Sequence, residues 1–543
     1  MKVSINWLKE LVGLKVSIDE VVRLLPLRTI GLKEITHDFT GDSRQASLIE
    51  LDMKGYNRAD LLSMRGVARE VAAITDSKLK FEDEQIPKFV LPETPVKVEN
   101  PELAPVYCIA KIENLKVEAS NKIWVRKLND SGMRAINNVA DITNLIMLEY
   151  GQPMHAFDAA CVDGETLVVR TARQGETLVT LDGKTRKLDT GDLLIADPKK
   201  ALGLAGVMGG KHSEVSDTTT TILIEAAIFD PTSIRRTAQR HGLYSEASKR
   251  FQHGLTKTNL LRALAAAIKM YGALGGKLTA LTLTEDLKDK SKILTLTQQK
   301  LNSLIGIDIT PDFVETSLQS LGFHPRGVGS NWEVTVPYWR QDCNIEEDLI
   351  EEVARMYGYE KIPPKSLEGK VPQKLDQSLQ HPIYDLKVAL KNAGLTEVQT
   401  YSFYGSKTIN DLQIKVNDLV KVSNPISSET EYMRDQIWPN LLEVVAKNIK
   451  QGFKDIAIFE IGKVYNPEKY HLAIALMNGS DNPMSELTSI SRGVKLTHSN
   501  GVQMDDRNLF HPTRVTENMA EVHPRILNKF GIEKRVAILE IEI

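Results

Sequence analysis

The chain has few cysteines and no long apolar run, and each shortage excludes a class of protein. Its 543 residues include three cysteines, Cys108, Cys161 and Cys343, which lie far apart. Isolated cysteines give neither a disulfide framework nor the paired spacing of a zinc site, and they are typical of a reducing compartment. No stretch approaches the roughly 18 apolar residues that span a bilayer, and the amphipathic N-terminus, which carries Glu10, is unlike a signal peptide. We therefore expect a cytoplasmic protein that does not enter a membrane.

Net charge is also scarce. The 68 basic and 71 acidic residues give a formal net charge of −3. A chain this balanced carries no global field that attracts nucleic acid, so any contact with RNA has to come from a local patch. The hydrophobic content of 42% and the charged content of 26% are those of an ordinary globular protein. At roughly 150 residues per domain, the length predicts three or four domains.

The chain divides into four predicted parts, and proline-containing stretches mark two of the three boundaries between them. Residues 82–98 and 361–380 hold three prolines each and read as linkers. The parts between and beside them mix helical with strand-like patterns, which predicts a multidomain α+β and α/β fold. The predicted parts are residues 1–80, 99–275, 290–363 and 381–543.

Hydrophobic periodicity predicts the elements of each part. A capping box at Ser17–Glu20 marks the start of a helix, whereas residues 36–50 read as a polar connector. The predicted strands are 167–170, 193–195, 222–225, 332–336, 398–403, 456–461 and 536–543. The predicted helices are 58–75, 231–240, 257–273, 311–321, 345–357, 384–393 and 439–450.

The segment Ile136–Asp158 is the most informative part of the chain. Its polar residues open a short apolar helix, which stops at Gly151 and Pro153 before His155. Polar groups beside a helix end and a histidine suit the wall of a small-molecule pocket. The same residues also suit a capped helix followed by a surface histidine, and spacing alone leaves both readings open. The polar residues are Asn137, Asn138, Asp141, Thr143 and Asn144.

The segment Ala201–Gly210, ALGLAGVMGG, carries four glycines in ten positions. Such a stretch lets the backbone approach a ligand or another strand closely. It lacks the lysine and the Ser or Thr of a phosphate-binding loop, so we reject a nucleotide site here.

An acidic cluster near residue 350 is a second candidate site. Asp348, Glu351 and Glu352 share one face of a predicted helix, and Asp342 can fold over that face. Four carboxylates that converge without a basic partner repel one another unless a cation lies among them, and oxygen ligands favour Mg²⁺ or Ca²⁺. The alternative is an exposed acidic helix start, which the helix dipole also favours.

Several long motifs occur in the order found in one family. They include MKVSINWLKELV at the start, NRADLLSMRGVAREVAA at 57–73, INNVADITNLIMLEYGQPMHAFD, TLDGKTRKLDTGDLLIAD and LAGVMGG. FDPTSIRRTAQRHGLYSEASKRFQHG, EEDLIEEVARMYGYEKIP, FEIGKVY and EVHPRIL follow. With these motifs, the chain resembles the β subunit of bacterial phenylalanyl-tRNA synthetase over most of its length.

The resemblance implies an architecture. Residues 1–80 are similar to the family's B1 unit, 99–275 to its B3/B4 editing module and 290–363 to its B5 module. Residues 381–543 resemble a class II synthetase fold that has lost its active site. Arg434 and FEIGKVY survive from that fold, but no later glycine-rich stretch ends in an arginine that would clamp ATP. ATP would therefore bind to a separate catalytic α subunit.

The resemblance also implies a function. The chain would be the β subunit of an α₂β₂ phenylalanine–tRNA ligase, which attaches phenylalanine to tRNA(Phe) with ATP, and it would hydrolyse mischarged Tyr-tRNA(Phe). Editing is needed because a hydrophobic pocket rejects an added hydroxyl by only about a hundredfold. Glu225 would bind the tyrosine hydroxyl, although without the resemblance its position favours a surface carboxylate at a strand end. Beside Glu225, the implied pocket holds Arg134, Asn144, His155, Ala205 and Gly209.

Two further sites follow from the resemblance. The magnesium-binding residues of the family map onto Asp342, Asp348, Glu351 and Glu352, where Mg²⁺ would be structural. A locally basic stretch either contacts tRNA phosphates or is a solvated helix face. It comprises Arg235, Arg236, Arg240, His241, Lys249 and Arg250.

The chain also departs from the family. Residues 36–50 are too short for the oligonucleotide-binding barrel of longer members, and no anticodon-binding domain follows the last strand at Ile543. Ala135 replaces a proline that usually follows the arginine at position 134. These departures put strong tRNA anchoring in doubt and leave two alternatives open. One is a structural β subunit that does not edit, and the other is a free-standing tRNA deacylase or RNA-binding protein without an α partner.

Overall fold

The computed structural model describes residues 1–40, 43–82, 91–283, 291–366, 368–369, 377–478, 482–494, 510–515 and 518–543. The chain divides into two compact units, Met1–Ser366 and Leu367–Ile543. Much of both predicted linkers, residues 83–90 and 370–376, lies outside the described residues. The linker prediction is wrong at Val96–Val98, which forms strand β6.

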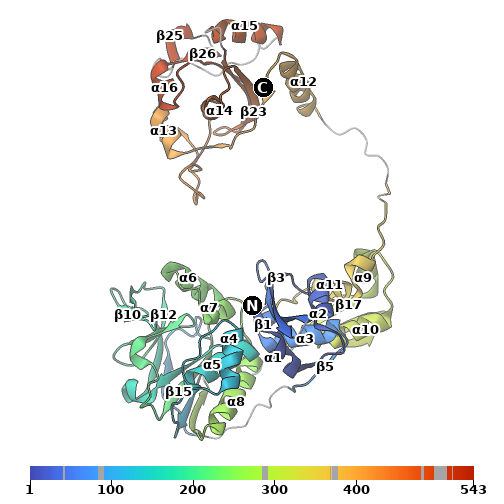
Figure 1. The fold of residues 1–543 in the computed structure, drawn as a ribbon, viewed down its shortest axis with the longest axis vertical. Coiled ribbons are helices and arrows are strands. Elements are labelled where there is room, and N and C mark those ends of the chain that lie inside the picture. Colours follow the sequence, from blue (N-terminus) through green and yellow to red (C-terminus); the bar gives the residue numbers. More distant parts are fainter. Residues whose placement is uncertain are drawn as a thin grey trace. The chain divides into compact units, whose positions relative to one another are not determined.

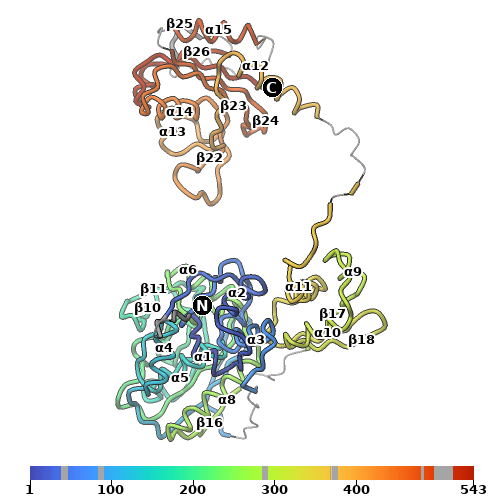
Figure 2. Tube along the Cα trace, turned by 45° about the vertical axis from the view of Figure 1, so that its right-hand side comes forward, coloured from blue at the N-terminus to red at the C-terminus, as the bar shows by residue number. Residues whose placement is uncertain are grey.

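The first unit has three parts. The N-terminal part (residues 1–82, blue) lies between the middle part (91–283, cyan to green) and the third part (291–366, yellow-green) in both views (Figure 1 and Figure 2). Ser4 donates a hydrogen bond to Asp130 in the middle part, and Arg355 of the third part donates one to the carbonyl of Arg28. Side-chain contacts therefore join the N-terminal part to both of its neighbours.

The N-terminal part packs helices on a three-stranded sheet with the order β1-β4-β3. The prediction of a polar connector at 36–50 is wrong, because these residues supply most of a β-hairpin. Ile49 pairs with Val3 of the first strand and is buried, so a non-local pairing forms the sheet where the local pattern looks polar. The elements are β1 (Lys2–Ser4), α1 (Ile5–Leu11), β2 (Val12–Gly13), α2 (Ile18–Arg28), β3 (Leu32–Thr40), β4 (Ser43–Leu51), α3 (Met64–Ile74) and β5 (Lys78–Leu79).

The middle part is built from two sheets and two covering helices. One face of the sheet β16-β7-β15-β8 packs on helices α5 and α8, and its other face packs on the sheet β14-β13-β12-β9-β6. The strands are β7 (Val106–Glu113), β8 (Met154–Asp158), β9 (Leu167–Thr171), β10 (Thr177–Val179), β11 (Thr185–Lys187), β12 (Leu193–Ala196), β13 (Ala201–Leu204), β14 (Met208–Gly209), β15 (Ile222–Ile228) and β16 (Lys277–Leu283). The helices are α4 (Lys122–Asp130), α5 (Asn138–Tyr150), α6 (Pro231–His241), α7 (Glu246–Phe251) and α8 (Lys257–Ala273).

The third part is a small three-stranded sheet with three helices. Its core contains Leu296, Trp332 and Leu349, which belong to different elements. Helix α10 begins at Pro311, as predicted from the Thr310–Pro311 pair. The strands, in the order β17-β19-β18, are β17 (Lys292–Thr297), β18 (His324–Val328) and β19 (Asn331–Val336). The helices are α9 (Gln298–Ile305), α10 (Pro311–Ser320) and α11 (Glu346–Tyr357).

The second unit is a six-stranded sheet with the order β20-β23-β24-β27-β26-β25. The predicted strand at 398–403 is wrong except at Phe403, because the chain leaves the sheet after Glu397 and pairs Tyr404 with Tyr432 instead. The strands are β20 (Thr396–Glu397), β21 (Phe403–Tyr404), β22 (Tyr432–Met433), β23 (Ile456–Val464), β24 (Lys469–Met477), β25 (Phe510–Val515), β26 (Met519–Val522) and β27 (Ala537–Glu542). The helices are α12 (Gln380–Asn392), α13 (Ser406–Leu412), α14 (Trp438–Lys450), α15 (Pro483–Gly493) and α16 (Pro524–Lys529).

Helix α14 is fastened to this sheet by a buried carboxylate. Glu540 on β27 accepts hydrogen bonds from the backbone N–H groups of Ile437 and Trp438 at 3.0 and 2.9 Å, and its Oε1 lies 2.7 Å from His471 Nδ1. The carboxylate therefore caps the helix start, where unpaired N–H groups favour a negative charge. Among the helices of the described residues, none is long and apolar enough to cross a membrane.

We predict that Glu540→Ala destabilises the second unit by about 3 kcal/mol, because it leaves two buried N–H groups without an acceptor. Hydrogen exchange of the α14 amides, measured by mass spectrometry on the full chain, reports the loss. Glu542→Ala is the matched control, since Glu542 lies two residues further along β27 in a partly exposed pair with Lys469. Equal exchange in the two variants would contradict the capping role.

Candidate functional site

A pocket of about 270 Å³ opens in the middle part. Its wall combines helix α5, strands β8 and β15, and the turn between β13 and β14. The structure brings five of the six implied pocket residues together here, namely Asn144, His155, Ala205, Gly209 and Glu225. The surrounding wall is largely apolar and includes Met147, Phe157 and Phe251.

Glu225 is a buried carboxyl group on the central strand β15. It lies directly opposite His155 on β8, so both side chains point to the same face of the sheet. Its Oε2 accepts a hydrogen bond of 3.0 Å from the hydroxyl of Tyr107 on β7. Burial raises the pKa of Glu225 to about 7, although the Tyr107 hydrogen bond acts in the opposite direction. The reading of Glu225 as a surface carboxylate is therefore wrong.

Tyr107 is a residue of the site that the sequence did not reveal. It lies opposite Ala227 on the paired strand, one alternation away from Glu225, so the two side chains share a face. Its ring lies 6.4 Å from the ring of Phe229. Burial and the neighbouring carboxyl of Glu225 raise its pKa, so the hydroxyl stays protonated and donates. A strand tyrosine is common in any core, and only the strand register distinguishes this one.

His155 lines the pocket rather than the protein surface. Its Nε2 is buried and has no hydrogen-bond partner among the described residues. Burial lowers the pKa of His155 to about 4, so the imidazole is neutral near neutral pH. The ring packs edge-on against Phe157 at 4.6 Å. A neutral imidazole nitrogen in such a place can accept or donate one hydrogen bond to a ligand.

Glycines of the 201–210 segment leave space for the side chain of His155. Gly209 pairs with Gly203 across the β13–β14 turn, and a Cβ on Gly209 would lie 2.6 Å from Cε1 of His155. Gly206 has a φ of +64°, which favours glycine, and its Cβ would crowd Phe251 at 2.9 Å. The predicted close approach of this backbone to another strand is confirmed.

The polar residues around the start of helix α5 divide into two groups. Asn137 accepts hydrogen bonds from the first-turn N–H groups, Asn138 binds the backbone of the 116–118 loop, and Asp141 accepts from Ser120. These three side chains cap and tie the helix, as the capped-helix reading predicts. Asn137 also lines the pocket, together with Thr143 and Asn144. The capped-helix reading is thus confirmed for the cap residues and wrong for its surface histidine, because His155 lines the pocket.

Arg134 and the basic stretch lie away from the pocket wall. Arg134 is exposed and precedes the lining residue Ile136 by two positions. Asp192 pairs with Arg240 and His241, while Glu246 pairs with Lys249 and Arg250. Four of the six basic residues are thus hydrogen-bonded to carboxylates of the same part. The other two, Arg235 and Arg236, are exposed on helix α6.

The acidic residues near 350 do not converge. Asp348 accepts hydrogen bonds from the backbone N–H groups of Asn344 and Ile345, so it caps helix α11. Glu351 is exposed, and Asp342 and Glu352 are paired with arginines. The expectation that no basic partner lies among them is therefore wrong. No group of three or more His, Cys, Asp or Glu is placed to hold a metal ion in the part of the chain that the structure describes.

Mg²⁺ binding by the four acidic residues near 350 stays a prediction. The arrangement of these side chains in the structure does not fit it. A divalent cation needs several oxygens directed at one centre, whereas the oxygens of Asp342 and Glu352 are directed at guanidinium groups. No step of the function below is derived through this ion.

Arg434 in the second unit has its donors engaged inside the fold. Nε binds the carbonyl of Lys463 at 3.0 Å, Nη1 binds Thr400 at 2.9 Å, and Nη2 binds Glu460 at 2.9 Å. The side chain is buried. An arginine held in this way stabilises the sheet and is not presented to a phosphate group.

The pocket suits an aromatic group that carries a hydroxyl. Apolar walls accommodate a ring, and Glu225 can exchange a hydrogen bond with a hydroxyl at the base. Ser245, a hydroxyl in the wall, donates to the carbonyl of Val207 and caps helix α7. Since that hydroxyl is engaged, Ser245 is not presented as a nucleophile, whereas Nε2 of His155 can orient a polar group.

Three family models match successive regions of the chain. The B3/4 domain matches residues 103–276, the tRNA synthetase B5 domain matches 294–359, and the phenylalanyl tRNA synthetase beta chain CLM domain matches 362–543. The predicted mixed fold with these kinds of domain is confirmed, whereas the predicted domain boundaries stay predictions.

Curated relatives support the same family. A phenylalanine–tRNA ligase beta subunit from Staphylococcus haemolyticus is 38% identical over 416 residues, which cover 75% of this chain and 52% of that protein. One from Moorella thermoacetica is 35% identical over 529 residues, covering 90% of this chain and 65% of the relative. One from Geobacter sulfurreducens is 33% identical over 537 residues, with coverages of 89% and 66%. The chain thus spans about half to two thirds of the length of these relatives.

We predict that Tyr107→Phe raises the pKa of Glu225 further above its ordinary value. The hydrogen bond that Tyr107 donates stabilises the ionised carboxylate, and the substitution removes it. The infrared band of the protonated carboxyl, followed against pH and referenced to Glu225→Gln, measures the shift. Tyr271→Phe is the matched control, since Tyr271 is also buried but donates to the carbonyl of Val139. The prediction fails if Tyr107→Phe titrates like the wild type.

Proposed function

Because the chain belongs to the phenylalanyl-tRNA synthetase β-subunit family, we propose that it assembles with a catalytic α subunit and hydrolyses tyrosine wrongly attached to tRNA(Phe). The complex would be an α₂β₂ ligase of the cytoplasm, in which ATP and the synthetic reaction belong to the α subunit. The observation that carries the editing proposal is the buried carboxyl of Glu225 in the wall of a largely apolar pocket.

The pocket would select tyrosine through its hydroxyl. A tyrosyl group can form a hydrogen bond with Glu225, whereas a phenylalanyl group would desolvate the same carboxyl and offer it nothing in return. Sites that hydrogen-bond a substrate hydroxyl reject the analogue without it far more strongly than an apolar site rejects an added hydroxyl. Such a pocket therefore supplies the discrimination that a hydrophobic synthetic site lacks.

The other wall residues would place the ester for attack by water. Asn144 and His155 lie in the same wall, and the unpartnered Nε2 of His155 offers one hydrogen bond to the aminoacyl group or to the attacking water. Ala205 keeps the space next to Glu225 open with its single methyl group. The exposed Arg134, near the rim residue Ile136, would meet the terminal ribose or its phosphate.

The engaged donors of Arg434 support a synthetic site on the α subunit. Binding a nucleotide phosphate at Arg434 would break its buried pair with Glu460, and breaking such a pair costs about 3–5 kcal/mol. The second unit would then provide the surface for assembly rather than catalysis.

We predict that Glu225→Ala lowers hydrolysis of Tyr-tRNA(Phe) by about 10- to 100-fold, the range of one charge-assisted hydrogen bond. Ala205→Trp would abolish it by filling the pocket. The assay is release of tyrosine by the complex with its α subunit, with phenylalanine attachment unchanged as a check on folding. Glu214→Ala is the matched control, because Glu214 is a wall carboxylate that is exposed. Equal hydrolysis by all variants would refute the site.

Co-expression with the candidate α subunit separates this proposal from its alternatives. We expect the two chains to purify together and to release tyrosine from Tyr-tRNA(Phe). A complex that attaches phenylalanine but never deacylates Tyr-tRNA(Phe) would indicate a structural β subunit. A chain that deacylates and never retains an α subunit would indicate a free-standing deacylase.

A further inference from the structure

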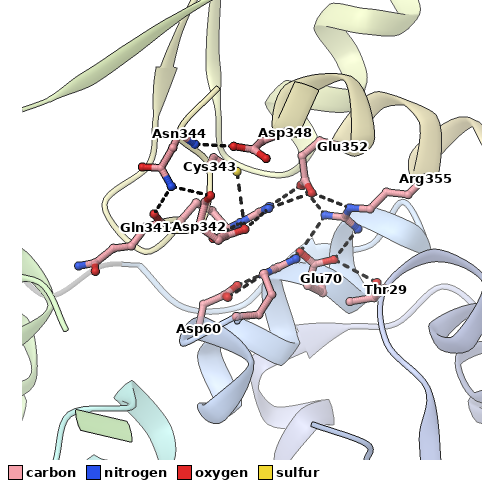
Figure 3. Close-up of polar contacts among 12 residues, drawn as sticks. Thr29, Asp60, Glu70, Gln341, Asp342, Cys343, Asn344, Asp348, Glu352 and Arg355 are labelled. Atoms are coloured by element: carbon pink, nitrogen blue, oxygen red, sulfur yellow. Dashed lines mark hydrogen bonds and ion pairs between the residues drawn. The ribbon is translucent and has the colours of Figure 1, made fainter. Parts of the chain in front are cut away.

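Seven charged side chains meet at the boundary between the N-terminal part and the third part of the first unit. Figure 3 shows most of them, with Glu352 and Arg355 on helix α11 above Glu70 on helix α3. We call this set the interface ion-pair network. Its members are Arg58, Asp60 and Glu70 from the N-terminal part and Arg340, Asp342, Glu352 and Arg355 from the third part.

Arg355 forms the buried connection between the two parts, beside the partly exposed pair of Arg28 with Glu360. Its Nη1 and Nη2 lie 2.8 and 3.0 Å from the two oxygens of Glu70, which is a bidentate pair across 285 residues of sequence. Its Nε and Nη2 also bind Glu352 at 2.9 and 2.6 Å. Nη1 donates a further hydrogen bond to the carbonyl of Arg28. One guanidinium thus binds two carboxylates and a main-chain oxygen.

The network extends from Arg355 in both directions. Glu70 accepts a second guanidinium, Arg58 Nη2, at 2.6 Å, and that nitrogen also binds Asp60 at 2.7 Å. Glu352 accepts hydrogen bonds from both terminal nitrogens of Arg340, which in turn binds Asp342 at 2.7 Å. Positive and negative groups alternate along the whole path.

Burial makes this alternation necessary. Glu352 is 1% exposed and Glu70 is 3% exposed, so an unpaired charge at either position would cost several kcal/mol. Burial alone raises the pKa of Glu70, but the charges of Arg355 and Arg58 lower it to about 2. Three guanidinium groups face four carboxylates, and each oxygen of Glu70 and Glu352 already accepts from an arginine. A divalent cation placed here would meet three fixed positive charges.

The network also supports the helix that carries the pocket wall. The carbonyl of Asp60 accepts a hydrogen bond of 2.7 Å from Ser63, and Ser63 lies against Gly151 at the end of helix α5. Arg65 on helix α3 binds Glu149 at 3.1 Å. Helix α3 thus holds one end of α5 while the network holds helix α3.

We propose that the interface ion-pair network fastens the third part to the N-terminal part, and that Asp342 and Glu352 serve there as arginine partners. The union of the two parts is then independent of a bound divalent cation. Asp348 and Glu351 take no part in the fastening, because one caps helix α11 and the other is exposed.

A double-mutant cycle in the full chain tests the fastening. Glu70→Met or Arg355→Met alone leaves a buried charge without its partner, so each is expected to raise hydrogen exchange of the α3 and α11 amides on the order of 100-fold. The double variant should recover much of this loss, since both charges leave together. Additive losses in the double variant would overturn the proposal.

A magnesium titration tests the independence from metal. We expect the wild-type unfolding midpoint to be the same in EDTA and in excess MgCl₂, and calorimetry to detect no Mg²⁺ binding. Glu351→Gln is the control variant, because it distinguishes attachment by the ion-pair network from attachment by a metal ion without disturbing the fold. The network predicts no effect of this substitution, whereas a metal site predicts loss of Mg²⁺-dependent stabilisation. Stability that EDTA removes, MgCl₂ restores and Glu351→Gln abolishes would overturn the proposal.

Discussion

A carboxylate taken out of water has to find partners, and this requirement organises both units of the protein. Glu70, Glu352 and Glu540 meet this requirement in full, through guanidinium groups or helix N–H groups, and each of them joins its own helix or strand to another segment of the chain. Glu225 meets it only in part, through the hydroxyl of Tyr107. The difference separates structure from function, because a fully paired group stabilises the fold and a partly paired group can still bind a ligand.

The sequence predicted elements whose signals are local. Helices α8 and α10 and strands β12 and β15 follow from periodicity and caps within their own residues. The hairpin at 36–50 and the exit of the chain after Glu397 were missed, because both depend on pairing with distant strands. Family motifs located five residues of the pocket, but Tyr107 became visible only through strand register. The acidic cluster was misjudged because the pattern considered its carboxylates alone, although Arg340 and Arg355, which pair with Asp342 and Glu352, lie nearby in the sequence.

The pocket and the interface ion-pair network are connected through helices α5 and α3. Helix α5 supplies wall residues along its length and ends against Ser63, next to the network residue Asp60. The N-terminal part is therefore more than a spacer, since its helix α3 is held on one side by arginine–carboxylate pairs and supports the pocket on the other. A rigid support of this kind is what a site needs to distinguish two ligands that differ by a single hydroxyl.

The opposed positions of Glu225 and His155 also bear on how such a pocket can change. Their separation is fixed by the hydrogen-bonded register of β8 and β15, and no loop contributes to it. The volume in front of them is set by different residues, in the glycine-rich turn and helix α5. Substitutions in the turn, except at Gly209, whose Cβ would crowd His155, can therefore resize the pocket for another ligand while the polar pair stays in place. The polar pair and the residues that set the pocket volume thus lie on different elements, and each set can change in evolution without the other.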